Sequence, residues 1–262
     1  MLVRKPTRAG KSGRRLSHVP RTVCAVQALI VFDGDDTLWR VENLYDEARK
    51  HAAAIAAEVG FDPEYWTRLQ KEIDLANVVT LGLSPRRFPL SSVLAYERVA
   101  NECGAKINDA VKRRILQASA EVFDATASLL PGALAVVGQL AQTHRLALLT
   151  QGDPAVQGKR IADSGLAPYF NIIRVVDRKD DQSFAEVIAD AGTEPRCAWS
   201  VGNSIPSDIN PALRIGMNAI WIDAHVWAHE RRESAPISGD VTECSSLVEV
   251  PTIIKKQREF GW

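Results

Sequence analysis

Short continuous runs of apolar residues alternate along this chain with longer segments in which apolar residues recur at helical spacing. The first run, AVQALIVFD at residues 25–33, has the pattern of a strand that is buried on both faces. Four similar runs follow in the second half of the chain: RLALLT, NIIRVV, CAWSVG and NAIWID. The pattern therefore predicts five buried strands.

Helical segments separate these later strands, and their ends carry recognisable signals. The segment at 153–165 has Pro154 in its first turn and Gly165 at its end, as helices commonly do. Further helices are predicted at 133–144, 183–192 and 207–216. Strands that alternate with helices of this length form right-handed βαβ units. The predicted fold class is α/β, with a doubly wound, mainly parallel, Rossmann-like sheet that carries helices on both faces.

A helical pattern fills residues 41–127, which contain no convincing strand. The predicted helices cover 44–60, 62–79, 90–104 and 108–125, and Asn108 or Asp109 is the expected N-cap of the last. Because the strand at 25–33 belongs to the same sheet as the later strands, this helical domain is an insertion. We expect a core domain of residues 26–40 and 128–230, interrupted by the helical domain of residues 41–127.

The two ends of the chain are less regular. The last residues, 231–262, form a weakly patterned extension, with a short helix at 245–257 that is interrupted near Pro251. The first 21 residues contain seven Lys or Arg and no acid, which leaves 25 basic against 32 acidic residues in the rest. We expect residues 1–25 to be a disordered tail. A mitochondrial-type targeting peptide is the alternative, and a nucleic-acid-binding arm is disfavoured because no aromatic residues interleave the charges.

Composition limits the cellular location and the binding partners that we expect for the protein. With 46% hydrophobic residues, the chain can form a sizeable core without disulfides. The four cysteines show no CxxC spacing, so we interpret them as reduced thiols in a cytoplasmic protein. No apolar stretch approaches the ~18 residues of a membrane span. We therefore expect no membrane or nucleic-acid partner and a monomer or homodimer.

Candidate chemistry lies where the predicted strands end. Ligands of such sheets bind at the carboxyl ends of the strands. The residues found there are Asp33, Asp35, Asp36, Thr150, Gln151, Lys179, Asn203 and Asp208. Clustered carboxylates tolerate one another when a cation lies between them, and oxygen ligands suit Mg²⁺. Together with a lysine and a hydroxyl, they predict a site for Mg²⁺ and a phosphate group, in which one carboxylate attacks and its neighbour moves a proton.

In these positions the chain resembles the haloacid dehalogenase-like superfamily, in its phosphatase branch, over residues 29–223. The strand followed by DGDDT fits the first motif, DxDx(T/V), and LLTQGD fits the second, a Thr at a strand end. RKDDQSF fits the lysine of the third motif, for which Lys159 is a poorer candidate than Lys179. VGNSIPSD fits the acidic fourth motif. The inserted helices are similar to the all-α cap of the family's first cap class.

The resemblance implies a Mg²⁺-dependent phosphomonoesterase that acts on a small phosphorylated metabolite. Asp33 is then the nucleophile that forms an aspartyl-phosphate, and Asp35 protonates the leaving oxygen and later deprotonates the attacking water. The implied phosphate-binding residues are Thr150, Gln151 and Lys179. The implied Mg²⁺ ligands are the Asp33 carboxylate, the Asp35 main-chain carbonyl, Asn203 and Asp208.

Alternatives remain at this point. Asn203 stands where the family often has a metal-binding Asp, which leaves open a 2-haloacid dehalogenase or a phosphate-binding regulatory module without turnover. Asp35 favours phosphate chemistry, because the dehalogenases lack this second Asp. Taken alone, Thr150 is a possible helix N-cap, Lys179 a surface lysine, Asp208 a helix cap and Asn203 a turn residue. Arg86 and Arg87 either meet a second anionic group or lie in a solvent-facing turn, and we favour the turn.

Overall fold

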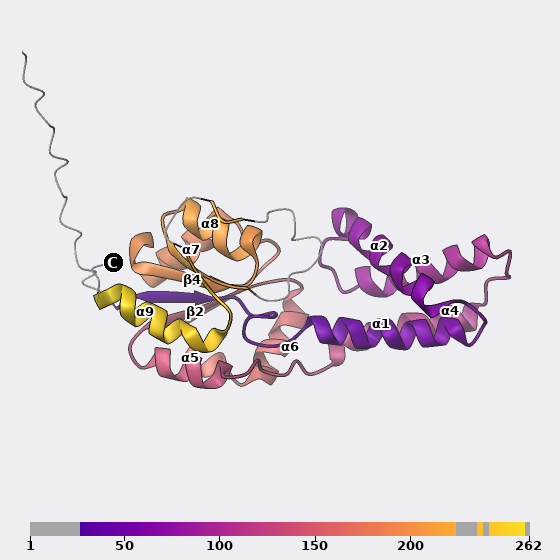
Figure 1. The fold of residues 1–262 in the computed structure, drawn as a ribbon, viewed down its shortest axis with the longest axis horizontal. Helices are drawn as coiled ribbons and strands as arrows, with labels where there is room; N and C mark the ends of the chain where they lie inside the picture. Colours follow the sequence, from indigo (N-terminus) through magenta and orange to yellow (C-terminus); the bar gives the residue numbers. More distant parts are fainter. Residues whose placement is uncertain (1–26, 224–234, 238–240, 260–262) are drawn as a thin grey trace, which may run out of the picture.

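The computed structural model describes residues 27–223, 235–237 and 241–259, and a six-stranded parallel sheet lies at its centre (Figure 1). The strand order is β3-β2-β1-β4-β5-β6. The strands are β1 (Leu29–Phe32), β2 (Arg145–Gln151), β3 (Ile172–Val176), β4 (Ala198–Gly202), β5 (Asn218–Ile222) and β6 (Val241–Cys244). All five neighbouring pairs are parallel, as the βαβ pattern predicted. The α/β fold class is therefore confirmed.

Helices cover both faces of the sheet, because the side chains of each strand alternate between them. Ile30 and Phe32 of β1 belong to one hydrophobic cluster, and Leu29 and Val31 belong to another. The first cluster includes residues of α5 (Ala133–Ala141), α6 (Pro154–Ser164) and α9 (Val250–Glu259). The second includes residues of α7 (Asp181–Ala191) and α8 (Asn210–Arg214).

Four helices are inserted between β1 and β2 and extend away from one end of the sheet (Figure 1). They are α1 (Glu42–Ala57), α2 (Pro63–Leu81), α3 (Arg87–Glu102) and α4 (Asp109–Asp124). Their apolar faces share a cluster of buried residues that contains Trp66, Val99 and Ile115. The two segments that join the insertion to the sheet pair through Arg40 N with Ser128 O at 2.8 Å. The limits of the two domains, 41 and 127, stay a prediction.

The helix ends that were predicted from capping residues, proline and glycine are confirmed in α4 and α6. The Asn108 side chain accepts a hydrogen bond from Ala110 N at 2.9 Å and caps α4. Pro154 begins α6, and Gly165 ends it in the left-handed region at φ 66°. The helix predicted at 207–216 instead consists of a π-helical turn, Ile205–Ile209, followed by the short α8.

The C-terminal part differs most from the sequence-based expectation. Strand β6 was missed, because its four residues, VTEC, are short and only partly apolar at the edge of the sheet. Pro251 does not interrupt the closing helix but lies in the first turn of α9, where a missing N–H costs no helical hydrogen bond. The tail predicted at residues 1–25 lies outside the described residues.

The cysteines only partly match the expected reduced thiols. Cys103 is exposed, Cys244 is buried, and both are free. Cys197 is disulfide-bonded, so the expectation is wrong at this position. Sequence spacing excludes a local CxxC pair but does not report which distant cysteines meet. Among the helices of the described residues, none is both long and apolar enough to span a membrane.

The buried face of α4 gives a test of the inserted core. Ile115 is completely buried, whereas its neighbour Leu116 is 47% exposed. We expect Ile115→Ala to lower the free energy of unfolding by about 2–5 kcal/mol, because it leaves a cavity among the inserted helices. Leu116→Ala should change it by less than about 0.5 kcal/mol. Urea denaturation followed by circular dichroism measures both, and equal losses would contradict the assigned packing.

Candidate active site

The loop after β1 turns sharply and sends its aspartates in different directions. A side chain at Gly34 would overlap the ring of Trp39, so the close approach of this tryptophan requires glycine. Asp36 adopts the left-handed conformation at φ 58°. Its carboxylate accepts hydrogen bonds from Val41 N at 2.8 Å and Glu42 N at 3.3 Å, at the start of α1. Asp36 is therefore a turn-forming and helix-capping residue, while Asp33 and Asp35 are free for other partners.

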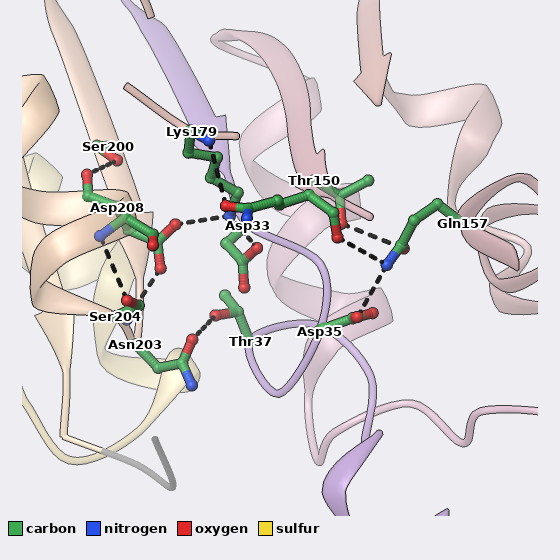
Figure 2. Close-up of polar contacts among 12 residues, drawn as sticks. Asp33, Asp35, Thr37, Thr150, Gln157, Lys179, Ser200, Asn203, Ser204 and Asp208 are labelled. Atoms are coloured by element: carbon green, nitrogen blue, oxygen red, sulfur yellow. Dashed lines mark hydrogen bonds and ion pairs between the residues drawn. The ribbon is translucent and has the colours of Figure 1, made fainter. Parts of the chain in front are cut away.

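Three charged side chains meet in the interior beside the end of β1 (Figure 2). The Lys179 ammonium, from the loop after β3, donates to the carboxylate of Asp33 and to that of Asp208, the latter at 2.6 Å. These side chains are only 4%, 7% and 2% exposed, respectively. Asp208 lies in the turn after β4, where its other oxygen accepts a hydrogen bond from Ser204 N at 2.9 Å. The parallel sheet thus gathers three strand ends around one ion-pair cluster.

The surroundings of this cluster oppose a full negative charge on Asp33. Burial raises the pKa of Asp33 to about 8, while the attraction of Lys179 opposes the shift and the repulsion from Asp208 adds to it. Burial also acts against the charged form of Lys179, but the negative charges of Asp208 and Asp33 outweigh it and raise its pKa. One cation therefore faces two carboxyl groups. A further positive charge in this position would stabilise the ionised form of Asp33.

Thr150 and Gln151, at the end of β2, connect to the same region. The buried Thr150 hydroxyl donates to Gln157 Oε1 at 3.2 Å. Gln151 Oε1 accepts a hydrogen bond from the main-chain N–H of Lys179 at 3.2 Å. Asp153, not Thr150, caps α6, since its carboxylate accepts from Ala155 N at 2.9 Å. The interpretation of Thr150 as a helix cap is therefore wrong.

Asn203 combines a turn with a contact to the loop after β1. Its side-chain oxygen accepts a hydrogen bond from the Thr37 hydroxyl at 3.2 Å. Its main-chain oxygen accepts one from Trp221 Nε1 at 3.0 Å. Lys159, the poorer candidate for the third motif, forms an ion pair with Asp163 on the surface of α6. Its burial and its contacts with Asp33 and Asp208 thus favour Lys179 over Lys159 as the lysine of the third motif.

A small cavity of about 60 Å³ collects the predicted site residues. Its lining consists of Asp33, Asp35, Asp36, Leu83, Thr150, Gln151, Lys179, Asn203, Ser204, Ser207 and Asp208. All seven residues predicted as catalytic, phosphate-binding or metal-binding are among them. Leu83 comes from the loop between α2 and α3, and sequence patterns contain no signal for it. Leu83 reaches the cavity only because of the way in which the inserted helices are oriented relative to the sheet.

The two arginines of the same loop region have different environments. Arg86 is exposed. Arg87 is buried and forms an ion pair with Asp74 of α2, so the favoured interpretation as a solvent-facing turn is wrong for Arg87. The helical period alone did not reveal this, because the burial of Arg87 results from packing between α2 and α3.

Asp35 has a separate set of partners on the side of the cavity near α6 (Figure 2). Its carboxylate accepts hydrogen bonds from Trp39 Nε1 at 2.7 Å, Gln157 Nε2 at 2.9 Å and Arg160 at 2.6 Å. Sequence reasoning missed Gln157 and Arg160. The available signal was their spacing of three, which puts two polar residues on one face of the helix that follows the second motif.

The donor set fits Mg²⁺. Within the described part of the chain, no group of three or more His, Cys, Asp or Glu side chains is arranged to hold a metal ion. The expected set is of another kind, with two carboxylates, the Asn203 amide and the Asp35 main-chain carbonyl. These residues line one cavity, and all can offer the hard oxygen ligands that Mg²⁺ prefers.

Comparison with known proteins gives a consistent picture. Residues 28–216 match the family model of the haloacid dehalogenase-like hydrolases. The chain is 25% identical over 206 residues to the pyrimidine 5'-nucleotidase YjjG of Escherichia coli, which covers 75% of this chain and 86% of that protein. It is 28% identical over 114 residues to a phosphoserine phosphatase of Thermus thermophilus, covering 40% and 46%. A haloacid dehalogenase-like family hydrolase from Xanthomonas campestris has a similar structure, with a TM-score of 0.72 at 24% identity, covering 90% of this chain and 99% of that one.

The buried lysine predicts a large effect on stability. Lys179→Met leaves the carboxyl groups of Asp33 and Asp208 buried without their cation, so we expect the free energy of unfolding to fall by about 3–5 kcal/mol. Lys159→Met is the matched control, because its ion pair with Asp163 lies at the surface and should contribute less than about 1 kcal/mol. Thermal and urea unfolding measure the difference. Similar losses in both variants would show that the buried cluster is not a stabilising element.

Proposed function

Because the chain belongs to the haloacid dehalogenase-like hydrolases, we propose that this hydrolase is a Mg²⁺-dependent phosphomonoesterase that forms an aspartyl-phosphate on Asp33. The observation that carries the proposal is one cavity lined by Asp33, Asp35, Thr150 and Lys179. It combines a nucleophile, a second carboxyl group for proton transfer and two groups for a phosphoryl anion. The names of the relatives, a nucleotidase and a phosphoserine phosphatase, support the same reaction type.

In the first step, a carboxylate oxygen of Asp33 attacks phosphorus. The bond from phosphorus to the leaving oxygen breaks, and Asp35 gives its proton to that oxygen. In the second step, a water molecule attacks the phosphorus of the aspartyl-phosphate while Asp35 accepts its proton. The bond to Asp33 breaks, and inorganic phosphate leaves with both carboxyl groups restored. Asp33 pairs with Lys179 and Asp35 pairs with Arg160, so the two carboxyl groups have different surroundings.

The remaining residues bind and orient the phosphoryl group. Lys179 neutralises the oxygens, and the Thr150 hydroxyl and the Gln151 amide are hydrogen-bonding groups beside it. Mg²⁺, held by the Asp33 carboxylate, the Asp35 carbonyl, Asn203 and Asp208, would supply positive charge that favours attack by one anion on another. The same charge would keep Asp33 ionised although it is buried.

The substrate is proposed to be a small phosphorylated metabolite. The cavity of about 60 Å³ holds roughly four water-sized groups, enough for the phosphoryl group but not for a large leaving group. We infer that the leaving group faces the insertion, which contributes Leu83 to the cavity lining. A screen of phosphorylated metabolites with wild-type protein would identify the substrate by its kcat/KM, which is ordinarily about 10⁴ M⁻¹s⁻¹ or higher.

The nucleophile assignment predicts a specific loss of activity. Wild-type protein should release phosphate from p-nitrophenyl phosphate with Mg²⁺, and Asp33→Asn should lower the rate by at least about 1,000-fold, because an amide is not a nucleophile. Asp153→Asn makes the same chemical change at the end of the neighbouring strand β2. This control should retain activity, since asparagine also caps helices.

The same assay separates the other reactions. Full activity of Asp33→Asn, or an equal rate in EDTA, would refute the proposal. Chloride release from 2-chloropropionate in EDTA, without phosphatase activity, would indicate a dehalogenase instead. Tight binding of beryllium fluoride with Mg²⁺, without turnover of any phosphoester, would indicate a regulatory module.

The amide at Asn203 predicts weakened metal binding. We expect Asn203→Asp to lower the dissociation constant of Mg²⁺ about tenfold, because a carboxylate adds a full negative charge to the ligand set. Asn101→Asp, on the exposed end of α3, changes the net charge equally and should leave the affinity unchanged. Isothermal titration calorimetry measures both. No change in Asn203→Asp would exclude this side chain from the metal site.

A further inference from the structure

We propose that Gln157 and Arg160 of α6 are positioning residues for Asp35, and that Arg160 links this acid–base group to Tyr45 of the inserted helices. The inference rests on the proposed role of Asp35 in proton transfer. It assigns a function to two buried polar residues that lie behind the cavity and do not line it.

Three donors determine the orientation of the Asp35 carboxyl group. One oxygen accepts from Trp39 Nε1 at 2.7 Å, and the other accepts from Gln157 Nε2 at 2.9 Å and from Arg160 at 2.6 Å. Bonds to both oxygens define the plane of the group as well as its position. The Asp35 side chain is 20% exposed and borders the cavity, whereas that of Arg160 is 4% exposed. Arg160 is therefore shielded from solvent, while the Asp35 carboxyl group remains accessible to a substrate in the cavity.

Gln157 couples Asp35 to the expected phosphate-binding strand end. Its amide nitrogen also donates to the Gln151 main-chain oxygen at 3.1 Å, and its amide oxygen accepts from the Thr150 hydroxyl at 3.2 Å. A single side chain thereby sets the position of the proton donor relative to the bound phosphoryl group. Gly152, at φ 143°, leaves the room for it, because a Cβ there would lie 3.1 Å from the Gln157 nitrogen.

Arg160 extends this contact to the insertion. Its positive charge acts on the hydroxyl of Tyr45, in the first turn of α1, and opposes the burial that raises the pKa of this tyrosine. The Tyr45 ring is buried and packs edge-on against Phe88 of α3, with ring centroids 4.9 Å apart. Burying a guanidinium is costly, and a buried ion pair often adds little stability over apolar packing. A pair placed at the proton-transfer group is better explained by the orientation that it imposes.

The chemistry provides a readout that a purely structural role would not change. A general acid matters most when the leaving oxygen is strongly basic, as in an alkyl phosphate. A nitrophenolate leaves without protonation and has little need of the acid. A displaced Asp35 should therefore slow alkyl phosphates much more than activated aryl phosphates, whereas a folding defect should slow both by the same factor.

The test compares kcat/KM for glycerol 2-phosphate and 2,4-dinitrophenyl phosphate with Mg²⁺. We expect Arg160→Met and Gln157→Leu to lower kcat/KM for the alkyl ester about 100-fold and for the aryl ester less than about tenfold. Arg160→Lys should recover part of the loss, and Asp35→Asn should show the same selective pattern. Tyr45→Phe should give a smaller selective loss. Lys159→Met, on the exposed side of α6, should leave the ratio unchanged.

The outcomes distinguish this inference from the function on which it rests. Equal losses on both esters in Arg160→Met and Gln157→Leu would overturn the positioning role while leaving the phosphatase assignment intact. Wild-type protein that hydrolyses neither ester would overturn both. If Arg160→Met does not fold, as judged by circular dichroism, the ratio measured in Arg160→Lys and Tyr45→Phe decides. An unchanged ratio in these two variants would overturn the link to the insertion.

Discussion

The structure depends above all on the buried contact of the Lys179 ammonium with the carboxyl groups of Asp33 and Asp208. Such charges are expensive to bury, and they are tolerated only where each finds partners. The sheet provides the partners, because β1, β3 and β4 end on the same edge and bring Lys179 to Asp33, 146 residues away in the chain, and to Asp208, 29 residues away. The contact therefore links stability to the site, because the burial that makes the cluster costly also raises the pKa of Asp33.

A second constraint separates two carboxyl groups that are only two residues apart. Gly34 allows the chain to turn against Trp39, so Asp33 faces Lys179 while Asp35 faces α6. The two environments differ in charge and in the number of hydrogen-bond donors. Different environments are what allow neighbouring carboxyl groups to take different chemical roles.

The insertion meets the sheet at two places that matter for chemistry. Leu83 lines the cavity, and the charge of Arg160, which holds Asp35, acts on Tyr45. Under the proposed mechanism, the first contact bears on which leaving group fits, and the second on how Asp35 is held. That mechanism connects selectivity and proton transfer to the same four helices, although these helices have a hydrophobic core of their own.

The sequence by itself determined those features that depend on local chemistry: the alternation of strands and helices, the caps at Asn108 and Gly165, and the polar residues at strand ends that line one cavity. The roles of those residues and the limits of the inserted domain remain predictions. Only the tertiary structure decided that β6 joins the sheet, that Leu83 reaches the cavity, and that Gln157 and Arg160 hold Asp35. The physical reason is that periodicity and capping act over a few residues, whereas these contacts join separate elements: β6 pairs with β5, and Gln157 and Arg160 lie 122 and 125 residues from Asp35. Which side chains meet across such distances is set by packing of whole elements, and no local pattern records it.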